Sequence, residues 1–240
     1  MDMVILGWLV NYLTGSPLAV AWIGFFRFMP FVLGPLGGVI SDRLDRRKIM
    51  LVSVCSSLVA AVIVTLIALF GTIHLWAIYV ISLGFGIGFA MDHPARRSLI
   101  YDIVGEKLVV NAMSLDQISF TLSRMMGPLM AGFLISVLGE DIHSAGLSFI
   151  FVCVVYCLAI VPLTMMVDSK IVAAGVANSI FLDLWEGLKY SLESPIIRGV
   201  LSITVVINIL IFPFIQLLPV FADEVLRVGA FELGLMGAAL

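Results

Sequence analysis

The chain consists of long apolar runs that are interrupted by one dense cluster of charges. Residues 17–40 contain a single charged side chain, Arg27, and residues 49–70 contain none. Between these runs, residues 42–48 carry four cationic and two anionic side chains. Charged groups are costly in hydrocarbon, so this cluster marks a tight loop at a membrane surface. Its excess of Arg and Lys places the loop on the cytoplasmic side.

The composition agrees with a helical membrane protein. Of the 240 residues, 62% are hydrophobic and 12% are charged, and the mean hydropathy is +1.18. A soluble domain carries about 25% charged residues, whereas a membrane-spanning helix needs about 20 predominantly apolar ones. The runs therefore predict an all-α polytopic membrane protein, with helices near residues 17–40, 49–70, 75–91, 112–138, 147–167 and 197–221.

The ends of the chain and its connections complete the predicted topology. Residues 3–13 are too short to span a membrane and predict the second half of a first helix, and residues 234–240 begin an eighth. The predicted inside loops hold about ten of the 13 Lys and Arg residues, as the positive-inside rule requires. Residues 98–111 and 181–192 predict amphipathic helices at the cytoplasmic surface. The expected parts are a truncated six-helix bundle (1–167), a cytoplasmic connection (168–195) and an incomplete second bundle (196–240).

The charged loop has a distinctive spacing. Gly38 precedes Asp42-Arg43 by four residues, and a run of three cations closes the loop. This pattern resembles the signature loop between helices two and three of the major facilitator superfamily, which has Gly at the position of Asp45. The resemblance implies that the loop's Asp meets a helix N-terminus of the other half of the protein, while its cations hold helix four. The implied conformational latch comprises Gly38, Asp42, Arg43, Arg46 and Arg47; the alternative is an ordinary positive-inside loop.

A second resemblance lies in the predicted helix five, residues 112–138. Arg124 is followed by Gly127-Pro128 and Gly132, which resembles the Gly-Pro-x-x-Gly-Gly pattern of the superfamily's exporters, with Ser123 and Ala131 at two of its glycine positions. The resemblance implies that this stretch kinks helix five and packs it against the second half. Proline removes a backbone hydrogen bond and glycine permits close helix contact, which suits that role. The alternative is an ordinary proline kink.

The order of several short segments narrows the resemblance to the enterobactin-exporter and macrolide-efflux branch. It implies a proton-coupled exporter whose small organic cargo, such as a drug, a macrolide or a siderophore-like molecule, binds between two six-helix halves. The expected partners are the lipid bilayer, the cargo, protons and the missing C-terminal half. The segments are residues 15–19, 94–96, 111–112, 124–128, 185–190 and 217–222.

Charged residues within the apolar runs are the mechanistic candidates. Arg27, Asp92, Asp116 and Arg124 lie within or at the ends of helices two, four and five, where ionisable groups mark transport pathways. Asp116 and Arg124 are eight residues apart, about 12 Å along one helix, and do not pair directly. The alternative is that these charges form static pairs between helices. In the chain as given, Arg27 and Arg124 are expected to lack some counter-charges.

Other function classes have little support in the sequence. There is no nucleotide-binding glycine loop, no zinc-ligand spacing and no nucleophile elbow, so we expect no enzyme, no cofactor, no metal and no nucleic-acid partner. The three cysteines lie within apolar runs and are expected to be unpaired. The alternative to a transporter is a membrane protein that binds partners through its helices, or an inactive remnant of a transporter.

Overall fold

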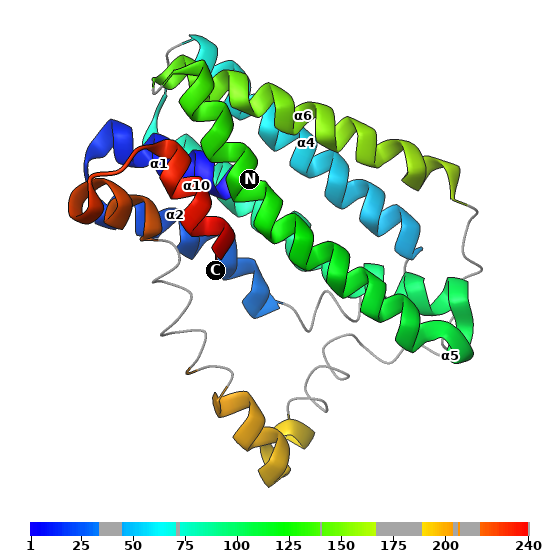
Figure 1. Ribbon diagram of the computed structural model, residues 1–240. Coiled ribbons are helices and arrows are strands. Elements are labelled where there is room, and N and C mark those ends of the chain that lie inside the picture. Colours follow the sequence, from blue (N-terminus) through cyan, green and yellow to red (C-terminus); the bar gives the residue numbers. More distant parts are fainter. Residues whose placement is uncertain are drawn as a thin grey trace.

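The computed structural model describes residues 1–33, 45–70, 73–139, 141–166, 189–203, 206 and 217–239. These residues form helices and no strand, which confirms the predicted all-α class. Figure 1 shows α4, α5 and α6 as the long rods of the bundle, with α1, α2 and α10 gathered beside them. In chain order the elements are α1 (Asp2–Thr14), α2 (Pro17–Phe28), η1 (Met29–Leu33), α4 (Arg46–Phe70), α5 (Leu75–Leu138), α6 (Ile142–Met165), α9 (Leu218–Val220), η2 (Phe221–Leu226) and α10 (Ala230–Ala239).

Three helices of the described residues are long and apolar enough to cross a membrane. They are α4, α5 and α6, with 25, 64 and 24 residues. The apolar helices α1, α2 with part of η1, and α10 are shorter. The turns near residues 15, 73 and 139 lie at one end of the bundle, which the charge distribution predicts to be outside. This end is called the outer end below, and the opposite one the inner end.

Helix α5 differs from the prediction. The sequence predicted that helix four ends at residue 91, that a loop returns the chain to the cytoplasm, and that residues 98–111 form a separate interfacial helix. Instead, residues 75–138 are helical on both sides of Gly105, where the backbone angles are non-helical. The φ of 68° at this position suits a residue without a side chain. The loop prediction was wrong: residues 92–97 are helical, and Asp92 and Arg96 form an i,i+4 ion pair along this helix.

Gly105 divides α5 into a first arm (residues 75–104) and a second arm (residues 106–138) that fold back on each other. The ring centroids of Phe89 and Phe120 are 6.5 Å apart, and those of His93 and Phe120 are 6.0 Å apart. The turn at Gly105 therefore makes a long helical hairpin, and both arms belong to the bundle (Figure 1).

The short apolar helix α1 occupies the centre of the core. In α1, Ile5, Leu6 and Val10 are fully buried, and they pack in one cluster with Phe85 of the first arm and Phe149 of α6. Many large apolar side chains on α4, α5 and α6 are exposed, as expected for surfaces that face lipid. The core thus forms around α1, and the outside of the bundle suits a membrane.

Several boundaries also differ from the predicted ones. Helix α2 ends at Phe28 and continues as a 3₁₀ turn over residues 29–33, where Pro30 cannot donate a backbone hydrogen bond. Helix α6 begins at Ile142 because Asp141 caps it, accepting a hydrogen bond from the Ser144 amide at 2.8 Å. Helix α10 begins at Ala230, four residues earlier than predicted. Of the predicted amphipathic helix, residues 181–188 lie outside the described residues and 189–193 are helical.

Candidate functional site

A buried ion pair joins α1 and α2. Nη2 of Arg27 lies 2.7 Å from Oδ2 of Asp2, and the two side chains are 14% and 13% exposed. The expectation that Arg27 lacks a counter-charge was therefore wrong. The sequence analysis missed Asp2 because an acidic residue at the edge of an apolar run looks like the end of a helix. Asp2 lies nearly as many residues before the turn near residue 15 as Arg27 lies after it. This similar spacing was the signal that could have identified Asp2 as the partner.

The surroundings of this pair are aromatic and tightly packed. The Arg27 guanidinium lies over the ring of Phe85, 5.3 Å from its centroid, a favourable cation–π geometry. The Phe85 ring stacks in turn on Tyr156 of α6, with centroids 6.5 Å apart. A side chain at Gly86 would clash with the backbone carbonyl of Arg27, so α2 and the first arm cross at this point. The pair thus sits where four helices meet.

The other predicted intramembrane charges do not join it. Asp92 pairs with Arg96 of its own helix at 2.8 Å, and its Oδ1 is buried with no hydrogen-bond partner among the described residues. Asp116 is half-buried and Arg124 is exposed on the second arm. Neither forms an ion pair with a described residue. Two of the four candidates, Arg27 and Asp92, therefore form ion pairs with residues that the sequence analysis did not select. The other two candidates stand apart from these pairs.

The cations that follow the charged loop bind two neighbouring helices. Arg46 forms an ion pair with Asp102 of the first arm, and its Nη1 also donates to the Ser98 carbonyl at 3.4 Å. Arg47 donates from Nε to the Leu163 carbonyl at 2.9 Å and from Nη2 to the Thr164 carbonyl at 2.6 Å, at the C-terminal end of α6. A cation suits that end of a helix dipole.

The remaining members of the predicted latch are Gly38, Asp42 and Arg43, which lie outside the described residues. The structure does describe Asp45, the residue that departs from the superfamily pattern. Its side chain is 7% exposed, and its Oδ1 accepts a hydrogen bond from the Arg47 amide at 3.0 Å. Asp45 therefore caps the N-terminus of α4, a position where a short acceptor side chain is favoured.

The glycines of the predicted exporter motif lie at a close helix contact. Helix α10 packs against the outer half of the second arm (Figure 1). A side chain at Gly132 would clash with the carbonyl of Ala230 and come within 2.9 Å of the Cα of Gly234. A side chain at Gly237 would come within 2.8 Å of the Cβ of Pro128. Gly127 instead faces Met1, which lies 3.0 Å from the place of a Cβ.

Two further contacts tie α1 to the elements near α10. Nδ2 of Asn11 donates a hydrogen bond to Oδ2 of Asp223 at 2.8 Å. A Cβ at Gly7 would lie 3.1 Å from Cγ of Pro219. Sequence reasoning missed both contacts, because they join residues more than 200 positions apart. Together with the α5–α10 contact, they bring residues 217–239 against the outer half of the bundle.

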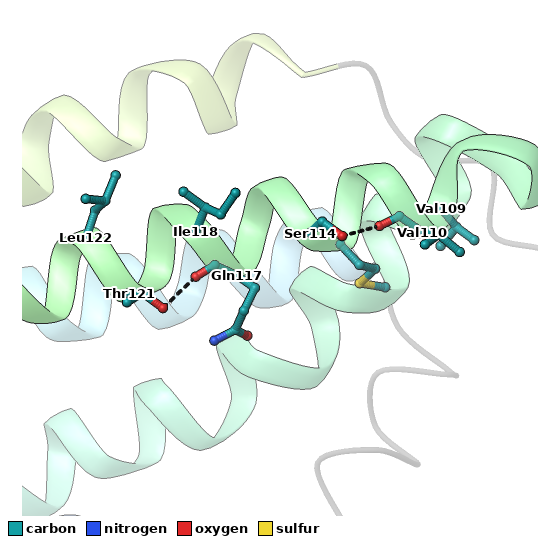
Figure 2. Close-up of a pocket in the computed structure, with 8 residues that line it drawn as sticks. Val109, Val110, Ser114, Gln117, Ile118, Thr121 and Leu122 are labelled. Carbon is teal, nitrogen blue, oxygen red and sulfur yellow. Dashed lines mark hydrogen bonds between the residues drawn. The ribbon is translucent and has the colours of Figure 1, made fainter.

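The inner half of the second arm carries a shallow, open groove of about 740 Å³, whose lining residues all come from this one arm. Figure 2 shows the lining side chains, which are mostly apolar. The hydroxyls of Ser114 and Thr121 donate to the carbonyls of Val110 and Gln117, each at 2.9 Å, so they are occupied by their own helix. Such a surface suits an apolar molecule or a packed helix. The lining residues are Val109, Val110, Met113, Ser114, Gln117, Ile118, Thr121 and Leu122.

Comparisons with known proteins agree on one family. Residues 1–240 match the family described as "Transmembrane secretion effector". Macrolide efflux protein A of Streptococcus pyogenes is 28% identical over 125 residues, 52% of this chain and 31% of that protein. The MFS-type transporter YfiS of Bacillus subtilis is 29% identical over 133 residues, 55% of this chain and 30% of that protein. Staphyloferrin A transporter of Staphylococcus aureus is 25% identical over 134 residues, 55% of this chain and 34% of that protein. The matched region spans about a third of the length of these relatives.

Proposed function

The chain belongs to the transmembrane secretion effector family of the major facilitator superfamily, and we propose that it forms the N-terminal part of a proton-coupled exporter of the inner membrane. The family and the names of its relatives point to a transporter of small molecules rather than to an enzyme. The proposed cargo is a small organic molecule with a large apolar surface, in the class of macrolides or siderophore-like compounds.

The observation that carries this proposal is the difference between the two ends of the second arm of α5. Its outer half is closed against α10 by Gly132 and Pro128, which allow backbone contact. Its inner half carries the apolar groove around Ser114 and Thr121. Alternating access needs an arrangement that is closed on one side of a central site and accessible on the other. The proposed cargo therefore enters from the cytoplasm along the inner half of this arm.

The residues selected from the sequence take defined roles in this mechanism. Gly38, Asp42 and Arg43 form the proposed latch toward the second half, and Arg46 and Arg47 anchor that latch to α5 and α6. Pro128 and Gly132 form the contact with α10 that is proposed to close the outer end, and Arg124 and Gly127 precede it on the same arm as the rest of the proposed exporter motif. Arg27, Asp92 and Asp116 are the proposed intramembrane charges. A complete second six-helix half is the proposed partner.

The test uses the full-length protein that contains this chain, reconstituted in vesicles with an imposed pH gradient. We expect a saturable flux of a fluorescent macrolide in the direction opposite to the proton flux, and we expect a protonophore to abolish it. Empty vesicles and vesicles containing an Asp42→Asn variant are the controls, and the variant is expected to insert normally but to transport less. Properly inserted protein that moves no cargo in either direction would contradict the proposal.

A further inference from the structure

The Asp2–Arg27 pair lies in the middle of the membrane. Asp2 precedes the outer end of α1 by 12 residues, and Arg27 follows the start of α2 by ten, so both lie about 15–18 Å from the outer turn. That is about half of the ~30 Å hydrocarbon thickness. Phe85 follows the start of the first arm by ten residues and lies at the same depth. Sites for coupling ions in secondary transporters lie near this midplane.

We propose that Asp2 is the carboxylate that carries the coupling proton, and that Arg27 holds it ionised until α1 moves. This inference rests on the proposed function, because it assigns the proton step of the exporter to one residue. When the pair separates, the Asp2 carboxylate takes up a proton from the outer side. When the pair forms again, that proton is released toward the cytoplasm.

One donor of Arg27 has no acceptor in the part of the chain that the structure describes. The ion pair joins Nη2 of Arg27 to Oδ2 of Asp2 at 2.7 Å. Nη1 is buried without a hydrogen-bond partner among the described residues. A second acceptor can therefore bind beside Arg27 when the carboxylate separates from it.

The two members of the pair are attached to different parts of the molecule. Arg27 is fixed by the crossing at Gly86, where no side chain fits between α2 and the first arm. Asp2 stands on α1, and the same helix contacts residues 217–239 through Gly7 on Pro219 and Asn11 on Asp223. A displacement of those residues therefore shifts α1, and with it Asp2, relative to a stationary Arg27.

The groups around Asp2 leave it as the carboxylate that responds to this movement. Immediately before α1, the amino group of Met1 lies 3.7 Å from its Oδ1, so in the given chain it is a second cation beside this carboxylate. On α2, the facing charge is Arg27; from the first arm Phe85 covers the guanidinium, and from α6 Tyr156 stacks on that ring. Deeper in the first arm, Asp92 is occupied by Arg96. A carboxylate separated from its cation in apolar surroundings is more stable with a proton bound.

The experiment compares Asp2→Asn with Asp92→Asn in the full-length protein, using two assays. The first measures macrolide movement driven by a pH gradient, and the second measures exchange of labelled for unlabelled macrolide without a gradient. We expect Asp2→Asn to lose gradient-driven movement down to the level of empty vesicles while it retains exchange. The control is Asp141→Asn, which removes an exposed carboxylate outside the proposed machinery and is expected to retain both activities. Asp92→Asn tests the rival carboxylate, and loss of gradient-driven movement there with intact coupling in Asp2→Asn would overturn the inference.

The outcomes separate this inference from the proposed function. If the wild-type protein shows no gradient-driven movement, the proposed function fails. If the wild type is driven by the gradient and Asp2→Asn is driven equally, Asp2 is not the proton carrier. Loss of exchange in Arg27→Gln together with intact coupling in Asp2→Asn would likewise overturn the inference, and would make Arg27 a cargo-binding group.

A second pair of variants covers poor accumulation of Asp2→Asn, which leaves Arg27 unpaired in the membrane. The double variant Asp2→Asn/Arg27→Gln removes both charges and is expected to accumulate and to exchange macrolide. A pH gradient is expected to drive no macrolide movement in this variant. Asp2→Glu keeps a titratable carboxylate and is expected to retain coupling with a shifted pH profile. Gradient-driven movement by the double variant, or loss of coupling in accumulated Asp2→Glu, would contradict the assignment.

Discussion

The outer and inner ends of the bundle are held together by different kinds of contact. At the outer end, residues 217–239 meet α1 and α5 through glycine and proline positions and the Asn11–Asp223 hydrogen bond. At the inner end, Arg46 and Arg47 bind an aspartate and a backbone carbonyl of α5 and two backbone carbonyls of α6. Apolar contacts between smooth surfaces separate at little electrostatic cost, whereas charge-assisted hydrogen bonds are stronger. The comparison indicates that the inner end of the bundle is held rigidly, whereas residues 217–239, and α1 with them, can shift at the outer end.

The largest expected effect comes from filling the outer contact. Gly132→Val places two methyl groups where a Cβ already meets Ala230 and Gly234, and such overpacking costs about 1–3 kcal/mol. We expect the full-length variant to accumulate in the membrane but to lose most macrolide transport, because the outer end no longer closes. Gly84→Val is the matched control, since no heavy atom lies within 4 Å of a Cβ there. Equal transport by both variants would show that the close contact is unimportant.

The next effect tests the rigidity of the inner end. Arg47→Ala removes the hydrogen bonds to the Leu163 and Thr164 carbonyls, and because these bonds are accessible to water each is expected to contribute about 1 kcal/mol. We expect the free energy of unfolding in detergent to fall by about 2 kcal/mol, measured by loss of helical circular dichroism. Lys48→Ala, at a side chain that is 75% exposed, should change it little. A smaller loss for Arg47→Ala than for Lys48→Ala would contradict the comparison.

A smaller effect is expected for the one hydrogen bond at the outer contact. Asp223→Ala removes the acceptor of the Asn11 amide, which costs about 1 kcal/mol and shifts an equilibrium by roughly fivefold. We expect the outer end to open more often in this variant. The measurement is the rate at which an impermeant thiol reagent labels Cys introduced at Val220, which is 7% exposed.

This labelling is done in a background without the three native cysteines. Asp223→Asn is the control, because its side chain still offers an oxygen acceptor to Asn11 and is expected to label at the wild-type rate. If Asp223→Ala also labels at that rate, the hydrogen bond does not hold the outer end closed.

The sequence predicted the fold class and the family because both depend on local patterns. Apolar runs identify spanning helices without knowledge of their neighbours. The α5 hairpin was missed for a physical reason: Asp92 and Arg96 look like a loop in a sequence, yet they pair along one helix face that extends beyond the apolar segment. Gly105, which makes the turn, was one glycine in a segment predicted to be helical. Asp45 could have been recognised as a cap, since it directly precedes a helical run.

The candidate site was less predictable, because its contacts join distant segments. The sequence showed that Arg27 needs a partner in the membrane, but not that α1 lies at the centre of the bundle with Asp2 at the matching depth. The contacts of Gly7 with Pro219 and of Asn11 with Asp223 depend on the packing of residues 217–239, which no local pattern contains. Periodicity assigns a face to a helix; tertiary packing decides which helix that face meets.

The smallest expected effect concerns the acidic caps at the two ends. Asp45 caps α4 at the inner end from a buried position, whereas Asp141 caps α6 at the outer end and is exposed. The Ser144 hydroxyl and amide both donate to Asp141 and hold the pKa of its carboxyl below the ordinary value of 3.8. Because this pKa is lower in the folded protein, the cap stabilises fully above pH 3.8, and its contribution is lost as the pH falls through the lower folded value.

Asp141→Asn separates this titration from the cap itself, because Asn also accepts hydrogen bonds from a helix N-terminus but does not ionise. We expect the melting temperature of the wild type to fall slightly more than that of Asp141→Asn as the pH is lowered below 3.8, because the cap loses its ionised form there. The outer cap faces the medium, so this difference should also appear in vesicles when only the external pH is lowered. Identical pH profiles for the two proteins would mean that the Ser144 hydrogen bonds do not stabilise the ionised form of Asp141.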